Sequence, residues 1–333
     1  MSTIQAGGTL LLTGHTLSRH LGAADYLAAV HDALVVMADA SLQVPAVTHV
    51  LGEGGGVHVK TAASTRRAVI KINANFPGNP AHAGLPTIQG VVALVDNTDG
   101  RLLALMDSVE ITAQRTAAVS AVAARQLARR DSTALGIIGC GLQARYHLAA
   151  LRTLFPFLDL YLHDVDDTRV TAVANQAGND LRVHACATPG AVARAADVLV
   201  TCTPSRRPLV HAADVKPGSF IAATGADSPD KQELAPDVLK MARVVTDSLA
   251  QAAQMGDLHH AISAGVVRES DIHAELADVV SGRTAGRSNA TECFVLDSTG
   301  VAVSDLAAAN LAYARCQADP AVPRIAFAQM ARE

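Results

Sequence analysis

Two glycines interrupt the stretch TALGIIGCGLQARYHLAAL, between an apolar run and a helix-like pattern. Gly139 would permit a tight turn after a strand, and Gly141 would let the backbone approach a bound pyrophosphate. The small side chain of Ala144 would let the following helix pack closely on its strand, and the helix N-terminus favours an anion. The spacing GxGxxA is by itself a weak signal, and an ordinary structural turn is the alternative.

An aspartate follows this turn at the length of one strand–helix–strand unit. Asp164 comes near the end of the apolar run LDLYLHDV, where a carboxylate would accept hydrogen bonds from the ribose of a bound adenosine. The neighbouring Asp166 and Asp167 would repel a 2′-phosphate. The context therefore predicts a dinucleotide site and favours NAD(H) over NADP(H).

Three further charged residues could do chemistry if the fold brings them to a site. Lys71 stands between Ile70 and Ile72 in a strand-like pattern, so it is either an outward, solvated lysine or a partly desolvated ammonium that binds a carboxylate or acts as an acid. Arg115 lies in ITAQRTAAVS, where its planar guanidinium could hold a carboxylate through two hydrogen bonds. Asp227 lies in the turn-like sequence ADSPD, and it either braces the turn or handles a proton.

Strand-like segments follow one another in the first part of the chain. Four of them have no helix-length sequence between them: 57–62, 67–76, 87–97 and 101–107. This order favours an antiparallel sheet, with NTDG at 97–100 typical of a hairpin turn. Helices are expected at Ala23–Ala40 and Val109–Arg130, the second as a connection between domains.

From Thr133 the rhythm changes to short apolar runs separated by helix-length segments. These runs are LGIIG, LDLYLHDV, RVHACA, DVLVTCT, SFIAATG and ARVVTDS. Strands separated by helices indicate βα units and a parallel sheet. After Ser298 the pattern is helical again, and this segment is expected to return to the first domain. We therefore expect a discontinuous domain at 1–130 and 305–333, and a second domain at 131–304.

Composition and charge argue against several classes of function. The net charge is −4 and no basic block occurs, so neither nucleic acid nor an anionic membrane is an expected partner. The five cysteines are odd in number and lack the spacing of a zinc site, so neither a disulfide framework nor a metal is expected. The N-terminus lacks the pattern of a signal peptide, and no apolar run is long enough to span a bilayer, which favours a cytoplasmic protein.

Nearly the whole chain also resembles the ornithine cyclodeaminase/μ-crystallin family, which includes ketimine reductases and an archaeal-type alanine dehydrogenase. The resemblance is carried by GLPTIQGVVALVDNTDGRLLALMD, SVEITAQRTAAVSAVAA, IIGCGLQA and TGADSPDKQEL. It implies a homodimer of the α/β class. A Rossmann-type NAD-binding domain would stand beside a mixed α/β dimerisation and substrate domain built from both chain ends.

The resemblance implies roles for individual residues. Lys71 and Arg115 would contact the substrate, and Asp227 would lie beside the reacting carbon as a proton-handling group. The μ-crystallin branch usually lacks an acid at this position, so the chain departs from that branch. Positions that match the family's cofactor side are Thr87, Arg115, Thr116, Gly139, Gly141, Leu142, Gln143, Ala144, Asp164, Thr203, Thr224, Gly225, Ala226, Lys231 and Ser298.

Two positions depart from the family pattern. The family usually carries an arginine that binds the substrate carboxylate in the segment matching VPAVTHV, where this chain has Val47 or a neighbour. Ornithine-specific members keep a glutamate about where His58 falls, and a histidine suits a second amino group less well. Both changes argue against ornithine as the substrate. His58 is either a polar substrate contact or a residue of the strand face.

The chemistry common to the family is hydride transfer between a nicotinamide and the α-carbon of an amino acid or cyclic imine. The resemblance therefore favours an NAD(H)-dependent imino-acid reductase or amino-acid dehydrogenase. A typical substrate would be a cyclic ketimine such as Δ1-pyrroline-2-carboxylate, reduced to proline. The alternatives are ornithine cyclodeaminase, a lyase that recycles its bound NAD+, and a non-catalytic nucleotide-bound protein, as in the crystallin use of this fold.

Overall fold

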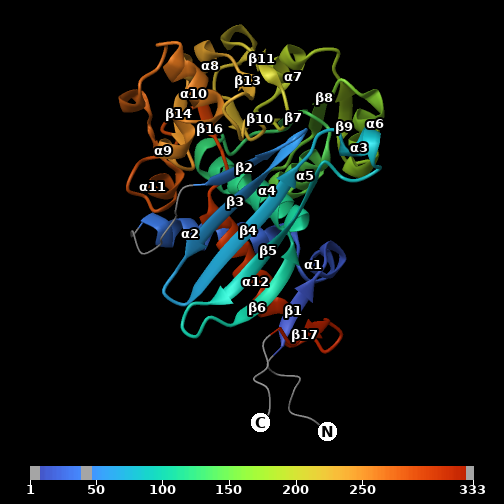
Figure 1. Cartoon of the computed structure of the whole chain (residues 1–333). Coiled ribbons are helices and arrows are strands. Elements are labelled where there is room, and N and C mark those ends of the chain that lie inside the picture. The colour runs from blue at the N-terminus through green and yellow to red at the C-terminus, as the bar shows by residue number, and fades with distance from the viewer. Residues whose placement is uncertain (1–7, 39–46, 328–333) are drawn as a thin grey trace, which may run out of the picture. The chain divides into compact units, whose positions relative to one another are not determined.

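The computed structural model describes residues 8–38 and 47–327, which form two compact units (Figure 1). Unit 1 combines Met1–Arg115 with Val301–Glu333, and unit 2 comprises Thr116–Gly300. Parts of three expected features lie outside the described residues: the ends of the chain, the last two residues of the helix expected at Ala23–Ala40, and 44–46 of the segment VPAVTHV. The domain boundaries expected near residues 130 and 304 stay a prediction.

Unit 1 contains a seven-stranded sheet in the order β17-β1-β6-β5-β4-β3-β2. The strands are β1 (Thr9–Leu12), β2 (Thr48–Gly52), β3 (Gly55–Ala63), β4 (Arg67–Asn75), β5 (Ile88–Asp96), β6 (Leu102–Asp107) and β17 (Arg324–Ile325). The four strands expected between residues 57 and 107 are confirmed as the antiparallel run β3 to β6. β1 pairs with β6 in parallel, and the sequence analysis missed β1, β2 and β17.

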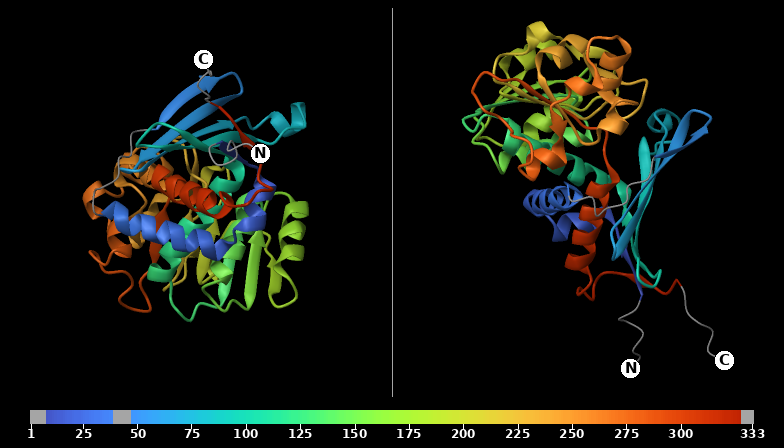
Figure 2. Two further views of the ribbon diagram at one scale, coloured as in Figure 1. Left: turned by 90° about the horizontal axis from the view of Figure 1, so that it is seen from below. Right: turned by 90° about the vertical axis from the view of Figure 1, so that its left-hand side faces the viewer.

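Helices cover one face of this sheet. The helices of unit 1 are α1 (Gly14–His20), α2 (Ala23–Ala38), α3 (Asn79–His82), α12 (Ala302–Cys316) and the start of α4 (Ser108–Leu127). Figure 2 shows α12 and then α2 on the same side of the sheet, and α12 packs against both α2 and the strands β3 to β6. The last helical segment of the sequence therefore returns to the first unit, as expected.

The two faces of the unit 1 sheet differ in their environment, because successive side chains of a strand point to opposite faces. On the face that carries α12, Ala62 and Val69 are fully buried. The opposite face is apolar as well, but Ile72 on β4 remains 40% exposed and Val50 on β2 remains 57% exposed.

No single helix in the part of the chain that the structure describes is long and apolar enough to cross a membrane. α1 and α2 pass that test only when counted together, and they meet at 90°. α2 buries Tyr26, Leu27, Val30 and Leu34, one stripe of an amphipathic helix.

Unit 2 contains an eight-stranded parallel sheet in the order β15-β14-β16-β12-β10-β7-β8-β9. The strands are β7 (Ala134–Ile138), β8 (Asp159–His163), β9 (Arg182–Ala185), β10 (Val198–Thr201), β12 (Phe220–Ala223), β14 (Arg243–Thr246), β15 (Ala274–Glu275) and β16 (Phe294–Asp297). All six strands expected from Thr133 onward are confirmed. β16 was not predicted from the sequence, although it lies between β12 and β14 near the centre of the sheet.

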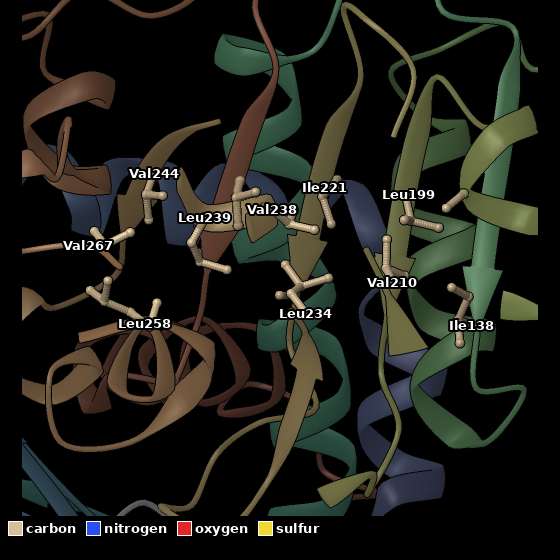
Figure 3. Close-up of a cluster of buried hydrophobic side chains, with 14 of the residues drawn as sticks. Ile138, Leu199, Val210, Ile221, Leu234, Val238, Leu239, Val244, Leu258 and Val267 are labelled. Atoms are coloured by element: carbon tan, nitrogen blue, oxygen red, sulfur yellow. The ribbon is translucent and has the colours of Figure 1, made fainter. Parts of the chain in front are cut away.

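Helices connect these strands. They are α5 (Leu142–Arg152), α6 (Asp167–Ala177), α7 (Pro189–Ala195), α8 (Pro236–Met241), α9 (Leu249–Ala252), α10 (Gly256–Ser263) and α11 (Leu276–Val280), with short 3₁₀ turns η2 (Ala212–Asp214) and η3 (Glu269–Asp271). A small second sheet pairs β11 (Arg206–Val210) with β13 (Gln232–Leu234). Figure 3 shows the aliphatic side chains, among them Ile138, Leu199 and Ile221, that pack between the sheet and these elements.

The strand order of unit 2 reverses beside β7. The chain moves from β7 outward to β8 and β9, and then returns to β10 on the other side of β7. In open parallel sheets, ligands bind outside the carboxyl ends of the strands at such a reversal. Unit 2 is a Rossmann-type sheet, and the carboxyl ends of β7 and β10 are the place to look for its ligand.

Candidate active site

The glycine-rich turn directly follows β7. Gly139 has φ +95°, and a Cβ there would stand 2.7 Å from the Thr203 side chain, so no other residue fits without strain. A Cβ on Gly141 would meet nothing within 4 Å, and Ala144 on α5 is fully buried. The backbone at the start of α5 is thus open on the side from which a phosphate group would approach, and the site fits a dinucleotide.

Asp164, just beyond β8, is held against this turn. Its Oδ2 accepts a hydrogen bond from the Cys140 backbone N–H at 2.7 Å, and its Oδ1 accepts one from the Asp166 N–H at 3.0 Å. Leu142 and Gln143 open α5, with Leu142 exposed and the Gln143 Oε1 buried without a hydrogen-bond partner. A hollow of about 470 Å³ adjoins the turn, lined by Cys140, Gly141, Leu142, Arg145, Thr168, Arg169 and Ala172.

A buried glutamate that the sequence analysis missed fastens two of the loops beyond the strands. Glu233 accepts hydrogen bonds from the Thr203 N–H at 2.6 Å, the Gly225 N–H at 2.8 Å and the Thr201 hydroxyl at 2.8 Å. Burial raises the pKa of Glu233, and these donors oppose that effect. The loops after β10 and β12 are therefore held in place by one carboxylate.

The remaining expected residues of unit 2 follow β12 and β16. The Thr224 hydroxyl donates to the Thr201 carbonyl, and Ala226 is buried. The Asp227 side chain is 52% exposed, and its Oδ1 lies 2.6 Å from the Lys231 Nζ. Because β12 and β16 are parallel neighbours, Ser298 lies at the same edge of the sheet.

Asp247, after β14, is a second carboxylate that the sequence analysis missed. It accepts hydrogen bonds from the Ser298 hydroxyl at 2.9 Å and from the Gly300 N–H at 2.6 Å. Asp247 therefore fixes the Ser298 loop as Glu233 fixes the loops beyond β10 and β12.

A buried ion triad forms the corresponding feature of unit 1. Lys71 on β4 is only 2% exposed, which excludes the outward, solvated orientation. Its Nζ lies 2.8 Å from Asp305 Oδ1 on α12, and the Nε of Arg115 on α4 lies 3.0 Å from the same oxygen. α4 begins directly after Asp107, whose carboxylate caps the helix by accepting from its first N–H groups and so fixes where Arg115 emerges.

The charges of this triad are unequal, because two cations share one carboxylate. Burial and the nearby Arg115 lower the pKa of Lys71 to about 7, although Asp305 opposes them. Lys71 and Arg115 hold the pKa of Asp305 below its usual value against the effect of burial. The cluster keeps an excess of positive charge in a buried place, which favours the binding of an anion.

Three expected residues remain: one histidine on the same sheet face as Lys71, and two threonines. His58 on β3 stands opposite Asn73, and its ring packs edge-to-face on His49 with centroids 4.6 Å apart. Thr87 precedes β5 and accepts a hydrogen bond from the Phe76 N–H through its carbonyl. Thr116 follows Arg115 on α4 and is buried.

The expected site residues thus fall into two groups, one in each unit. Lys71 and Arg115 come together in unit 1 through Asp305, and the glycine turn with the strand-end residues gathers in unit 2. The sequence signal for Asp305 was an acid within VAVSDLAAAN, an otherwise apolar helix. No group of three metal-ligating side chains occurs among the residues that the structure describes.

The fold and this turn define a dinucleotide-binding protein of the Rossmann type. The sequence profile of the ornithine cyclodeaminase/mu-crystallin family matches residues 9–319, so the chain belongs to that family. An alanine dehydrogenase of Archaeoglobus fulgidus is 36% identical over 305 residues, covering 92% of this chain and 94% of that protein.

Two solved structures are similar to the chain over nearly its whole length. An archaeal alanine dehydrogenase dimer with bound NAD is 34% identical in sequence, with a TM-score of 0.92. The match covers 96% of this chain and 99% of the alanine dehydrogenase chain. The Δ1-pyrroline-2-carboxylate reductase of Thermococcus litoralis, in complex with NADH and L-proline, is 28% identical. It covers 92% of this chain and 97% of its own, with a TM-score of 0.88. Relatives with bound NAD confirm the expected cofactor class and the fold class.

Proposed function

We propose that this NAD(H)-dependent oxidoreductase reduces an imino acid at its α-carbon, with a cyclic ketimine such as Δ1-pyrroline-2-carboxylate as the representative substrate. The reverse reaction is that of an amino-acid dehydrogenase. NADH supplies the hydride, and the protein supplies orientation, charge and a proton. Relatives that carry out reactions of this kind support the proposal.

The observation that carries the proposal is the buried triad of Lys71, Arg115 and Asp305. One carboxylate shared by two cations leaves a net positive charge, and the α-carboxylate of an imino acid would neutralise it. In this proposal Lys71 and Arg115 bind that carboxylate, and Asp305 holds both cations in position. Because Asp305 already holds Lys71 and Arg115 in place, the substrate carboxylate would bind without the cost of ordering these side chains.

Asp227 is our candidate for the proton-handling group. Its carboxylate is accessible and ion-paired with Lys231, so it can exchange protons with solvent and with a ligand. In the reduction, the hydride forms a C–H bond at the α-carbon while the imine nitrogen takes a proton, which Asp227 delivers directly or through a water.

We place the cofactor of this reaction in unit 2. The proposed contacts in unit 2 are the glycine turn, Leu142, Gln143, Asp164, Thr203, the loop from Thr224 to Ala226, Lys231, Ser298 and Thr116. Thr87 and Arg115, in unit 1, stay cofactor-side predictions from the family resemblance. Asp164 favours NADH over NADPH in this arrangement.

Ornithine cyclodeaminase is the second candidate function, and the accessible acid Asp227 is the observation that favours it. In that reaction NAD+ is reduced and reoxidised within one turnover, and ammonia leaves. His58, where ornithine-specific relatives keep a glutamate, disfavours the second amino group of ornithine. A non-catalytic role is disfavoured because Lys71, Arg115 and Asp227 are all present.

The experiment measures NADH absorbance and free ammonia in parallel on the purified protein. The substrates are Δ1-pyrroline-2-carboxylate, pyruvate in ammonium buffer, and L-ornithine. The reductase proposal predicts net NADH consumption with at least one of the first two. Ammonia release from ornithine without net change in NADH would identify the cyclodeaminase instead.

We also propose a homodimer formed through the apolar face of the unit 1 sheet that carries Val50 and Ile72. Exposed apolar patches of this kind mark interaction surfaces, and one related structure is described as a dimer. Light scattering at micromolar concentration should give twice the monomer mass, and Ile72→Lys should lower it. A monomeric wild-type protein would exclude this proposal.

A further inference from the structure

Lys60 lies directly opposite Lys71 in the unit 1 sheet. The two are cross-strand partners in the antiparallel pair β3–β4, and the next pair on the same face is Ala62 with Val69. Ala62 and Val69 are fully buried under the helix layer, so the side chain of Lys60 belongs to the same face as that of Lys71. Opposed side chains of this kind have Cβ atoms about 5 Å apart.

On its other side, Lys60 neighbours the position from which the family arginine is missing. β2 pairs with β3 in the register Thr48 to Val59 and His49 to His58. Continuing this register by one residue places Val47 opposite Lys60. Val47, which the sequence analysis names for the missing carboxylate-binding arginine together with its neighbours, is therefore adjacent to Lys60 on one face of the sheet.

The electrostatic surroundings of the triad include Lys60. Its ammonium contributes to the lowered pKa of Lys71, after burial and Arg115. It also helps to keep the pKa of Asp305 low. Lys60 is half-buried, so its charge is less screened than that of a surface lysine. Three cationic side chains, Lys60, Lys71 and Arg115, therefore surround a region in which Asp305 is the opposing carboxylate.

We propose that Lys60 is the third cation that binds the substrate α-carboxylate, in place of the arginine that this chain lacks at Val47 or a neighbour. The inference rests on the proposed function, because it needs an imino-acid or amino-acid carboxylate at the triad. The positive charge has moved by one strand across the sheet, from β2 to β3, and the sum of charges around the carboxylate is preserved.

The exchange of an arginine for a lysine has a chemical consequence. A guanidinium holds both carboxylate oxygens in one plane, whereas an ammonium is a compact charge with three donors and no fixed plane. Planar recognition of the carboxylate is therefore left to Arg115, and Lys60 contributes attraction. Removal of Lys60 should then weaken substrate binding more than it slows the chemical step.

The test compares Lys60→Met with wild type, using NADH and whichever of Δ1-pyrroline-2-carboxylate and pyruvate with ammonium the wild type reduces. We expect kcat/KM to fall on the order of 10²-fold, chiefly through KM, as for other truncated partners of buried charges. Lys240→Met, on the exposed side of α8, is the matched control and should behave as wild type.

Two rescue variants separate binding from a structural role. Lys60→Arg should recover most of the lost kcat/KM. The double variant Val47→Arg, Lys60→Met should recover it to within about tenfold, because the cation returns to the adjacent position on the same face. Melting temperatures of all variants are measured on the same preparations. A loss that neither variant rescues assigns Lys60 a structural role and overturns the inference.

The outcomes distinguish this inference from the proposed function. An active wild type with a Lys60→Met kcat/KM within threefold of it overturns the role of Lys60 alone. A wild type that reduces no imine overturns the proposed reaction. In that case, calorimetric titration of the NADH-loaded protein with L-proline and L-alanine still measures the Kd for a ligand that carries an α-carboxylate. Unchanged Kd values in Lys60→Met would then overturn the inference as well.

Discussion

The two regions that carry the candidate site differ in the chemical groups that they offer to a ligand. In unit 2 the ligand-facing edge consists of backbone N–H groups and an open glycine turn, held in shape by carboxylates such as Asp164 and Glu233. In unit 1 the corresponding place is made of charged side chains, with Lys71 and Arg115 buried around Asp305. In our proposal, the first region binds its ligand through oriented backbone N–H groups, and the second through buried charged side chains.

The two regions should therefore determine different kinds of specificity. An oriented backbone accepts any phosphate that fits, so the choice between nucleotides falls to a few side chains beside the ribose. Buried charged side chains select among substrates, because an unpaired cation in the low-dielectric interior is stabilised only by an anion that lies close to it. Substitutions in the two regions should therefore affect different kinetic constants.

The largest expected effect is that of Lys71→Met. Truncating one partner of a buried, hydrogen-bonded charge pair costs about 2–5 kcal/mol of binding, which corresponds to a loss in kcat/KM of about 30-fold to several thousandfold. The Kd for NADH, measured by fluorescence, should stay within about threefold of wild type because Lys71 is not among the proposed cofactor contacts. Equal losses in substrate and cofactor binding would break the division between the two regions.

Asp227→Asn should act on turnover. The two side chains have nearly the same shape, but the amide cannot ionise, so kcat should fall on the order of 10²-fold or more. Melting temperature and NADH binding should change little, since the carboxylate is half exposed and its ion pair with Lys231 is a surface interaction. If turnover per folded molecule stays near wild type, Asp227 only braces its loop and Lys71 becomes the candidate proton donor.

Substrate binding should depend on pH through Lys71. Its pKa is lowered to about 7, so the ammonium that attracts the carboxylate is lost as the pH rises above that value. We expect kcat/KM to fall by up to tenfold per pH unit on the alkaline side. Lys71→Arg, whose guanidinium stays charged, should lack this limb. If kcat/KM of Lys71→Arg falls over the same pH range as that of wild type, the titrating group is another residue.

The same shift has the opposite sign for stability. Between a pH of about 7 and the ordinary lysine value of 10.5, the unfolded chain holds a proton that folded Lys71 has released. The contribution of this residue to the free energy of unfolding therefore rises with pH across that window, while substrate binding declines. Urea denaturation of wild type and Lys71→Met at several pH values measures the difference.

The smallest expected effect concerns the choice of nucleotide in unit 2. Asp164→Ser should reduce the preference for NADH over NADPH by about tenfold, because a carboxylate beside the ribose repels a 2′-phosphate. Arg145 and Arg169 line the same hollow and would attract that phosphate, so the acids must outweigh them. A wild-type kcat/KM that is higher with NADPH would show that the arginines prevail. Asp237→Ser, on the exposed first turn of α8, is the control.

The sequence predicted the backbone-built region better than the charged one. The turn at Gly139, the strand before it and Asp164 lie within one strand–helix–strand unit, so local spacing determines them. Asp305 stands 234 residues from Lys71, and no local pattern reports such a pairing. Its only signal was an acid on an apolar helix. β16, FVLD, is as long as β10 and β12, which were predicted. It was missed because the polar stretch 281–293 before it shows no helical pattern that would mark a further helix–strand unit.

The central claim, hydride transfer from NADH to the α-carbon of an imino acid, is tested most directly with deuterium. The protein is incubated with Δ1-pyrroline-2-carboxylate and NADH labelled at C4, on one face in one run and on the other face in a second. We predict that one of the two labels appears at the α-carbon of the proline formed, with one NAD+ per proline. Proline without deuterium from either label, or ammonia released from ornithine with NADH unchanged, would contradict the claim.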